Sequence, residues 1–256
     1  MVALSTVLSL VKIIDMPYGG SVTIAAMLPI IIAVYRHGAA WGLVTALVNS
    51  AIQLLLGLNN VSYFTTWQSI IAVIMLDYIV AFGVFALAGI FKKVEKRQNY
   101  ALLYGAVLCS LLRYVCHVIS GATVWAGLSI PTEAALLYSL SYNATYMIPE
   151  TIVLVSVTAY LTSVVDFKAN IPTRIKSIKM EKREAYSILG AGLLFLITLI
   201  TDVCIIFPHL QDPESGEFVF SYIANANFLA LGIVSAIGLL GAIALVLYAK
   251  RSQKTK

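Results

Sequence analysis

The chain has 256 residues, of which 60% are hydrophobic and only 11% are charged, and its mean hydropathy is +0.91. These values lie outside the range of soluble globular domains and indicate an integral membrane protein. The net charge of +5 does not indicate a nucleic-acid partner, because the basic residues lie in short loops between apolar runs and not along one polar face.

The apolar runs predict an all-α protein that crosses the membrane repeatedly, since one helical span needs about 20 apolar residues. Eight apolar runs, the first two of them short, cover residues 1–14, 23–35, 40–57, 67–91, 100–120, 135–163, 186–207 and 222–248. We expect the second run to bend at Pro29, whose missing N–H frees a carbonyl one turn earlier. No basic segment precedes the first run, so a cleavable signal peptide is not predicted.

Basic residues follow every second run, which fixes the predicted orientation. The positive-inside rule places these connections in the cytoplasm, together with both termini. The opposite connection, residues 208–221, carries three acidic residues and no Lys or Arg. Only Lys12 and Arg113 depart from the pattern. The basic positions are Arg36, Lys92, Lys93, Lys96, Arg97 and the segments 168–183 and 250–256.

Apart from Lys12 near the end of the first run, five acidic or basic residues fall inside the predicted spans. A charged group in a bilayer is costly and generally faces a cavity or a partner, so each is a functional candidate. At about 1.5 Å per helical residue, those of the first six helices lie in the outer half of the membrane. Asp202 belongs to the last helix pair, where a hydrogen bond within the pair is the favoured interpretation. The others are Asp77, Arg113, His117 and Glu150.

Helical spacing predicts which polar side chains share a face. Four helices each present such a set, and one shared pocket is the economical interpretation. The sets are Arg113, His117 and Gly121; Tyr142, Tyr146 and Glu150; Trp67 and Tyr78; and Thr45, Asn49 and Gln53.

Several of these features have a purely structural alternative. The set Thr45, Asn49 and Gln53 is typical of hydrogen bonding between helices, although Gln53 is close enough to the outer surface to reach a pocket there. Arg113 and Glu150 form a candidate buried ion pair that braces two helices. Trp67 fits an aromatic belt at the membrane surface. Asp77 differs, because no single basic residue is assigned to it and a ligand cation is a natural counter-charge.

The residue types indicate a ligand class. A carboxylate, a Trp, several Tyr, a His and an Asn favour a flat, cationic, nitrogen-bearing ring. Charge pairing, cation–π contact and hydrogen bonds to the ring edge would each contribute. A vitamin, a nucleobase and an amine all fit this description.

Four motifs give the chain a family resemblance over about residues 3–165. They are MPYGGSVTIAAMLPI (16–30), LDYIVAF (76–82), RYVCHVISGATVW (113–125) and YSLSYNATYMIPE (138–150). In this order they resemble the thiamine-binding substrate component of energy-coupling factor transporters. The resemblance implies a six-helix bundle with a thiamine pocket near the outer face, closed by the loop after the first helix.

The resemblance also implies a set of ligand contacts. Asp77 takes the place of an acidic contact that is Glu in some members. Tyr18 lies in the closing loop, where the family has Trp or a polar residue. Arg113, Glu150 and Tyr146 are expected to be structural. The remaining implied contacts are Tyr78, His117 and Trp125 toward the thiazolium, Tyr138 and Asn143 toward the aminopyrimidine, Gly121 at the helix end, and Trp67 and Gln53.

Partners and domains follow from the same resemblance. It implies a transmembrane coupling subunit and two ATP-binding subunits in the bacterial cell membrane. We predict a thiamine-binding domain at residues 1–165, a basic cytoplasmic linker at 166–185 along the lipid surface, and a two-helix membrane extension at 186–256, which the family does not usually have.

Catalysis and cofactors are not predicted. The chain has no G-x-x-x-x-G-K-[ST] phosphate-binding loop, and its three His and three Cys show no metal-binding spacing. Two alternatives stay open. An ion-coupled carrier would use Asp77 and Glu150 as proton sites, and an intramembrane enzyme would use His117 and Glu150 as acid and base.

Overall fold

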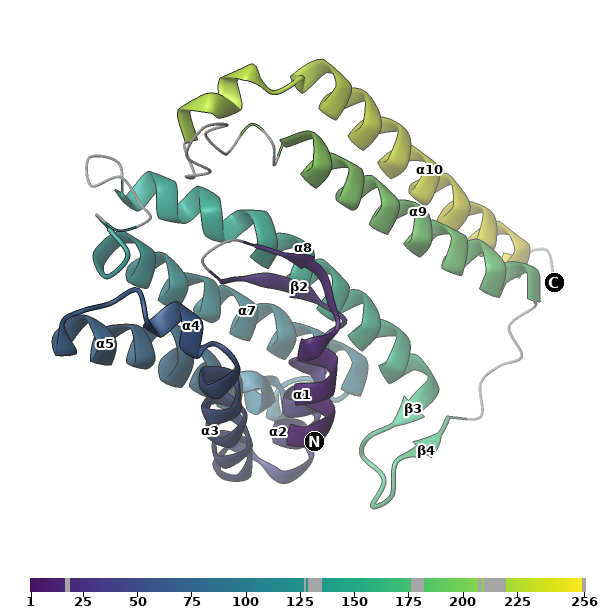
Figure 1. Cartoon of the computed structure of the whole chain (residues 1–256). Coiled ribbons are helices and arrows are strands. Elements are labelled where there is room, and N and C mark those ends of the chain that lie inside the picture. The colour runs from purple at the N-terminus through teal and green to yellow at the C-terminus, as the bar shows by residue number, and fades with distance from the viewer. Residues whose placement is uncertain are drawn as a thin grey trace. The chain divides into compact units, whose positions relative to one another are not determined.

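The computed structural model describes residues 1–16, 19–126, 128, 135–175, 182–206, 209 and 220–254. The chain divides into two compact units, Met1–Ile175 and Lys176–Lys256. Helices make up most of both, as Figure 1 shows. The predicted class, an all-α membrane protein, is therefore confirmed.

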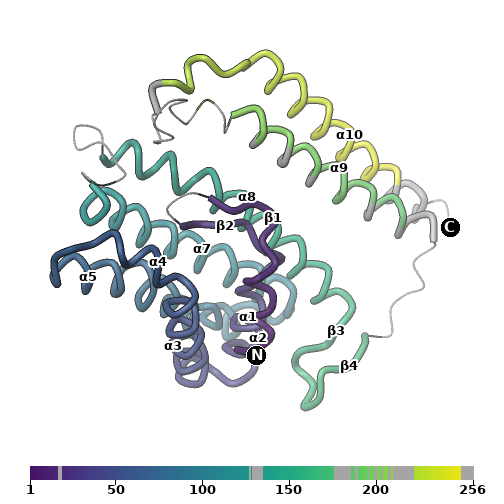
Figure 2. Tube along the Cα trace, viewed as in Figure 1, coloured from purple at the N-terminus to yellow at the C-terminus, as the bar shows by residue number. Residues whose placement is uncertain are grey.

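The first unit contains the candidate ligand residues. One helical rod, residues 67–93, runs through α5, η1, α6 and η2, and α7 lies beside α8 (Figures 1 and 2). In chain order the elements are α1 Val2–Leu10, β1 Lys12–Asp15, β2 Ser21–Thr23, α2 Leu28–His37, α3 Ala39–Leu56, α4 Leu58–Val61, α5 Trp67–Val73, η1 Ile74–Val80, α6 Ala81–Gly83, η2 Val84–Lys93, α7 Gln98–Thr123, α8 Ala135–Val164, β3 Val165–Asp166 and β4 Thr173–Arg174.

Five helices in the described part of the chain are long and apolar enough to cross a membrane. They are Ala39–Leu56, Trp67–Lys93, Gln98–Thr123, Ala135–Val164 and Phe228–Tyr248. Each corresponds to a predicted run, and the ends differ by a few residues. The predicted runs at residues 1–14, 23–35 and 186–207 have no counterpart among these five.

The first predicted helix is too long. α1 ends at Leu10, and the next residues form β1, which pairs antiparallel with β2 so that Asp15 lies opposite Ser21. Gly19 and Gly20, at φ +88° and +96°, adopt the left-handed backbone that glycine tolerates best. Lys12, an exception to the predicted charge pattern, forms an ion pair with Asp15 at 3.0 Å, and both side chains are exposed.

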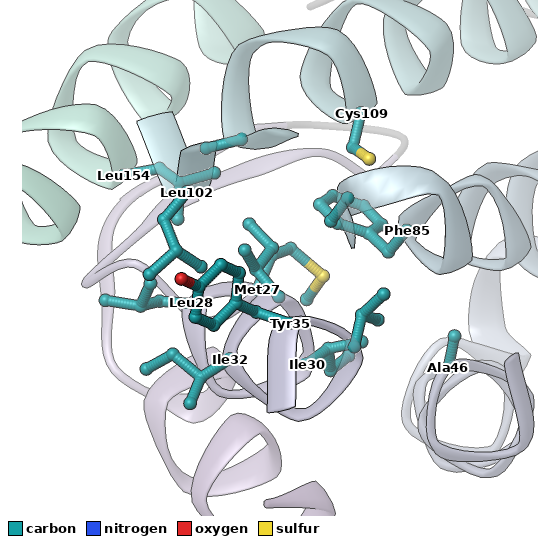
Figure 3. Close-up of a cluster of buried hydrophobic side chains, with 14 of the residues drawn as sticks. Met27, Leu28, Ile30, Ile32, Tyr35, Ala46, Phe85, Leu102, Cys109 and Leu154 are labelled. Atoms are coloured by element: carbon teal, nitrogen blue, oxygen red, sulfur yellow. The ribbon is translucent and has the colours of Figure 1, made fainter. Parts of the chain in front are cut away.

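α2 is a core helix and not a bent span. All residues from Leu28 to Tyr35 are buried, so the helix is apolar on every side. Pro29 lies in the first turn, where its missing N–H removes no intrahelical bond, and the predicted bend there is wrong. Figure 3 shows the surrounding cluster, with Phe85, Leu102 and Leu154 from three other helices.

The second unit is a helical pair. α9 (Lys182–Ile206) packs against α10 (Phe228–Lys254), which follows the short η5 (Phe220–Asn225). Gly238 lets the helices approach closely, because a Cβ there would overlap Oγ1 of Thr198. Ser235 Oγ donates to Oδ2 of Asp202 at 2.7 Å, so the favoured hydrogen bond within the pair is present.

Candidate ligand-binding site

Asp77 lies at the centre of a hydrogen-bonded cluster. It sits within η1, whose wide π-type turns are frequent at functional sites. Nδ1 of His117 is 2.9 Å from its Oδ1. Ser120 Oγ and Trp125 Nε1 donate to its Oδ2 at 2.7 and 3.0 Å. The Asp77 side chain is only 15% exposed, so its charge is largely removed from solvent.

These three donors correct one expectation about Asp77. The sequence assigned it no basic partner, whereas the fold brings the imidazole of His117 to it from α7. None of the three is Lys or Arg. The carboxylate is therefore stabilised by hydrogen bonds on both oxygens without a permanent positive charge beside it.

A second layer of charge lies next to this cluster and involves Arg113, one turn before His117 on α7. Its Nη1 is 3.7 Å from Oε1 of Glu150 on α8, and both side chains are largely buried. Its Nε donates to Nε2 of His117 at 3.3 Å. Thr23, at the end of β2, donates to the same Glu150 oxygen at 3.0 Å. The expected Arg113–Glu150 pair is thus present and also reaches the imidazole.

α8 is fixed against α7 at this level by Asn143 and Tyr146. Nδ2 of Asn143 donates to the carbonyl of His117 at 3.3 Å and to that of Ser139 at 2.9 Å. The Tyr146 hydroxyl donates to Oδ1 of Asn143 at 2.6 Å. The Tyr146 ring lies edge-on to the imidazole, with centroids 6.5 Å apart. These bonds hold the backbone and ring of His117 in place.

Two aromatic rings pack against Trp125 at one end of the cluster. The Trp125 ring packs edge-on against Phe64, at 4.8 Å between centroids, and is tilted against Tyr63 at 6.1 Å. Trp125 is 9% exposed and Gly121, one turn earlier, is buried. The indole is therefore held by neighbours on one side and by Asp77 at its N–H.

The end of the β1–β2 connection touches the same part of α8. The Tyr142 hydroxyl donates to the carbonyl of Gly19 at 2.9 Å. A Cβ on Gly20 would lie 2.8 Å from the Tyr146 ring. Glycine is needed here for contact as well as for backbone conformation.

Several residues that were predicted to contact the ligand are not among the three donors to Asp77. The Tyr78 hydroxyl donates to the carbonyl of Gly57 at 3.2 Å. Gln53 donates to Ser9 at 2.8 Å, which is the interhelical alternative. Trp67 is 68% exposed. Tyr78, which was expected to align with it, is buried. Tyr138 is buried, and Tyr18 lies outside the described residues.

Three contributors were not predicted. Ser120 follows His117 by three residues, and this helical spacing could have identified it. Phe64 and Thr23 come from segments distant in sequence from their partners, and no local pattern marks them. Within the described residues, no group of three or more His, Cys, Asp or Glu side chains could hold a metal ion.

A bundle of apolar helices around a desolvated, hydrogen-bonded carboxylate defines an α-helical membrane protein with a polar site between its helices. The chain belongs to the thiamine transporter protein family (Thia_YuaJ), which matches residues 1–170. It is 34% identical to "Thiamine transporter ThiT" of Bacillus subtilis (strain 168) over 164 residues, 60% of this chain and 81% of that protein. No solved structure shows a significant match. The family resemblance predicted from the four motifs is confirmed.

Proposed function

We propose that the chain is the high-affinity thiamine-binding subunit of an energy-coupling factor importer in the bacterial cell membrane. The observation that carries this proposal is the Asp77 carboxylate, which accepts three hydrogen bonds and has no Lys or Arg among those donors. Thiamine carries a permanent positive charge on its thiazolium ring. A fixed carboxylate compensates that charge where water cannot.

The neighbouring charges favour the same conclusion. Arg113 lies beside Glu150, so these two compensate each other. Asp77 then remains as the acidic group that a cationic ligand can neutralise. Because the carboxylate is already held by its neighbours, binding needs little ordering of the site.

The rings and amides supply the remaining recognition. Trp125 and His117, which both bond to Asp77, would contact the thiazolium, and the indole would contribute cation–π attraction. Tyr138 and Asn143 would meet the aminopyrimidine. Gly121, which lacks a side chain, lets that ring approach the end of α7.

Energy for transport must come from partners. The sequence has no phosphate-binding loop, so ATP hydrolysis is assigned to two ATP-binding subunits, which act through a transmembrane coupling subunit. With both termini in the cytoplasm, the Asp77 cluster faces the outer half of the membrane. Thiamine is captured there and delivered inward by the coupled module.

A binding experiment on the purified chain tests the ligand. We expect thiamine alone, without partners or ATP, to quench the Trp fluorescence saturably. Trp41 and Trp67 are both 68% exposed and Trp125 is 9% exposed, so Trp125→Phe should remove most of the quenching. Absence of saturable binding by calorimetry would refute the thiamine assignment.

An uptake experiment tests the coupling. Cells that express the chain with the coupling subunit and the ATP-binding subunits should accumulate labelled thiamine, and cells without the coupling subunit should not. Uptake that persists without it, and that collapses with the proton gradient, would support the ion-coupled carrier.

A further inference from the structure

Arg113, His117 and Asp77 form a chain of hydrogen bonds with a fixed direction. Nε of Arg113 carries a hydrogen and can only donate, so Nε2 of His117, 3.3 Å away, must accept. An imidazole nitrogen that accepts has no proton. The proton of His117 is therefore on Nδ1, which donates to Oδ1 of Asp77 at 2.9 Å.

This arrangement makes His117 neutral, although it lies within ion-pair distance of Asp77. An imidazolium would carry a second N–H on Nε2, and that hydrogen would point at the N–H of Arg113. The charges of the cluster are then one positive, on Arg113, and two negative, on Asp77 and Glu150. The net charge of −1 is the complement of one monovalent cation.

We propose that Arg113 is a positioning residue for cation binding, which holds His117 as the neutral Nδ1–H tautomer and so leaves the negative charge of Asp77 for the ligand. This inference rests on the proposed function, since it explains how a site that contains Arg and His still selects a cationic ligand. It assigns Arg113 a role beyond bracing Glu150.

The charged and titratable groups around His117 all enter this balance. Asp77 faces its Nδ1 from η1, and Arg113 faces its Nε2 from the preceding turn of α7. From α8 come the Tyr146 ring and Glu150, which is paired with Arg113. Protonation of His117 would bring the net charge of the cluster to zero. Thiamine affinity is therefore expected to be lower whenever His117 carries a second proton.

The tautomer can be measured without any ligand. His37 and His209 are replaced by Gln, so that His117 is the only histidine, and the ¹⁵N-histidine signals of the purified chain are recorded. At about pH 7.5 we expect one protonated nitrogen, Nδ1, and one unprotonated nitrogen, Nε2. A protonated Nε2 at this pH, in either the neutral or the charged ring, would overturn the proposal.

A double variant tests the role of Arg113. Arg113→Met with Glu150→Gln removes the donor to Nε2 together with both members of the ion pair, so no buried charge is left unpaired. Nε2 of His117 then no longer faces an N–H donor, so the geometry no longer requires it to be unprotonated. The ratio of the thiamine Kd at about pH 6 to that at about pH 8 should rise about tenfold above the wild-type ratio.

A matched control removes a pair that is exposed. Arg97→Met with Glu95→Gln removes an ion pair at 3.5 Å in which the Arg side chain is 69% exposed. This control should keep the wild-type pH ratio. An equal ratio in the wild type and the Arg113/Glu150 variant would overturn the proposal.

The ligand-free measurement keeps the two proposals distinguishable. A wild-type chain that shows the expected imidazole signals but does not bind thiamine would support the hydrogen-bond chain and overturn the proposed ligand. A wild-type chain that binds thiamine with Nε2 of His117 protonated would support the ligand and overturn the role of Arg113.

Discussion

Asp77→Asn is the substitution that most directly tests the charge argument. It keeps the shape of the side chain and removes its negative charge. The amide oxygen can still accept from Ser120 and Trp125, but the amide nitrogen then faces Nδ1 of His117, where the carboxylate accepted. The fold should survive, because two of the three hydrogen bonds remain possible.

The size of the effect follows from the burial of Asp77. At an effective dielectric constant of about 20, unit charges 4–5 Å apart attract each other by about 3–4 kcal/mol. The Asn dipole retains part of this attraction, so we expect a loss of about 2–3 kcal/mol. That loss corresponds to a rise in the thiamine Kd of roughly 30- to 160-fold.

The assay is calorimetric titration of the purified variant with thiamine and with an uncharged analogue whose thiazolium is replaced by a neutral aromatic ring. The wild type should prefer the cation strongly, and Asp77→Asn should lose most of this preference. Asp202→Asn is the matched control, because that carboxylate also lies in an apolar helix and accepts from Ser235. It should bind thiamine as the wild type does.

Two outcomes would contradict the reasoning. If Asp77→Asn binds thiamine within threefold of the wild type, the carboxylate does not compensate the ligand charge. If it loses the neutral analogue as strongly as thiamine, the substitution has damaged the site in some other way. A thermal-shift measurement without ligand separates this second case from loss of the fold.

Two glycine substitutions, each with a matched control, test the packing. Gly20→Ala should raise the thiamine Kd several-fold, because the added Cβ would lie 2.8 Å from the Tyr146 ring. Its control is Gly38→Ala, because Gly38 has a similar φ of +88° but nothing lies within 4 Å of the added Cβ. This control should cost about 1 kcal/mol of stability without changing the Kd. Gly238→Leu should lower the melting temperature or expose α9 and α10 to proteolysis, since a Cβ there meets a threonine side chain on α9. Gly232→Leu, which has open space, should change neither, and equal effects would contradict the assigned helix contact.

Length and apolarity predicted the long helices because each requires an uninterrupted apolar segment. The same criterion failed at the N-terminus. Residues 1–14 are apolar enough for a helix, but the charge pair of Lys12 and Asp15 and the two glycines that follow favour a strand and a tight connection. Residues 23–35 were misread for a different reason. A short helix that is apolar on all sides has the same hydropathy whether lipid or protein surrounds it, and α2 is surrounded by protein.

Part of the candidate site could be recognised from single helices. His117 and Gly121 lie on one face of α7 by spacing alone, Asp77 stands out as a charge within an apolar run, and the family resemblance supplied Trp125. The contacts of Asp77 with His117 on α7 and with Trp125 just beyond α7 join residues 40 and 48 positions apart, and no periodicity specifies them. The π-type turns around Asp77 were equally hidden, since propensity distinguishes helix from strand but not one helical turn type from another.

The sequence could identify four ionisable residues within the helices but not how they combine. Taken one by one, Arg113 and a protonated His117 would repel a cationic ligand, and Asp77 would attract it. The geometry resolves this conflict, because Nη1 of Arg113 lies against Glu150 while its Nε holds His117 in the neutral state. The guanidinium of Arg113 thus compensates the carboxylate of Glu150. It also prevents a positive charge from forming on His117, beside the carboxylate of Asp77. The negative charge of the site therefore depends on the direction of two hydrogen bonds, which only the packing of α7 against η1 and α8 determines.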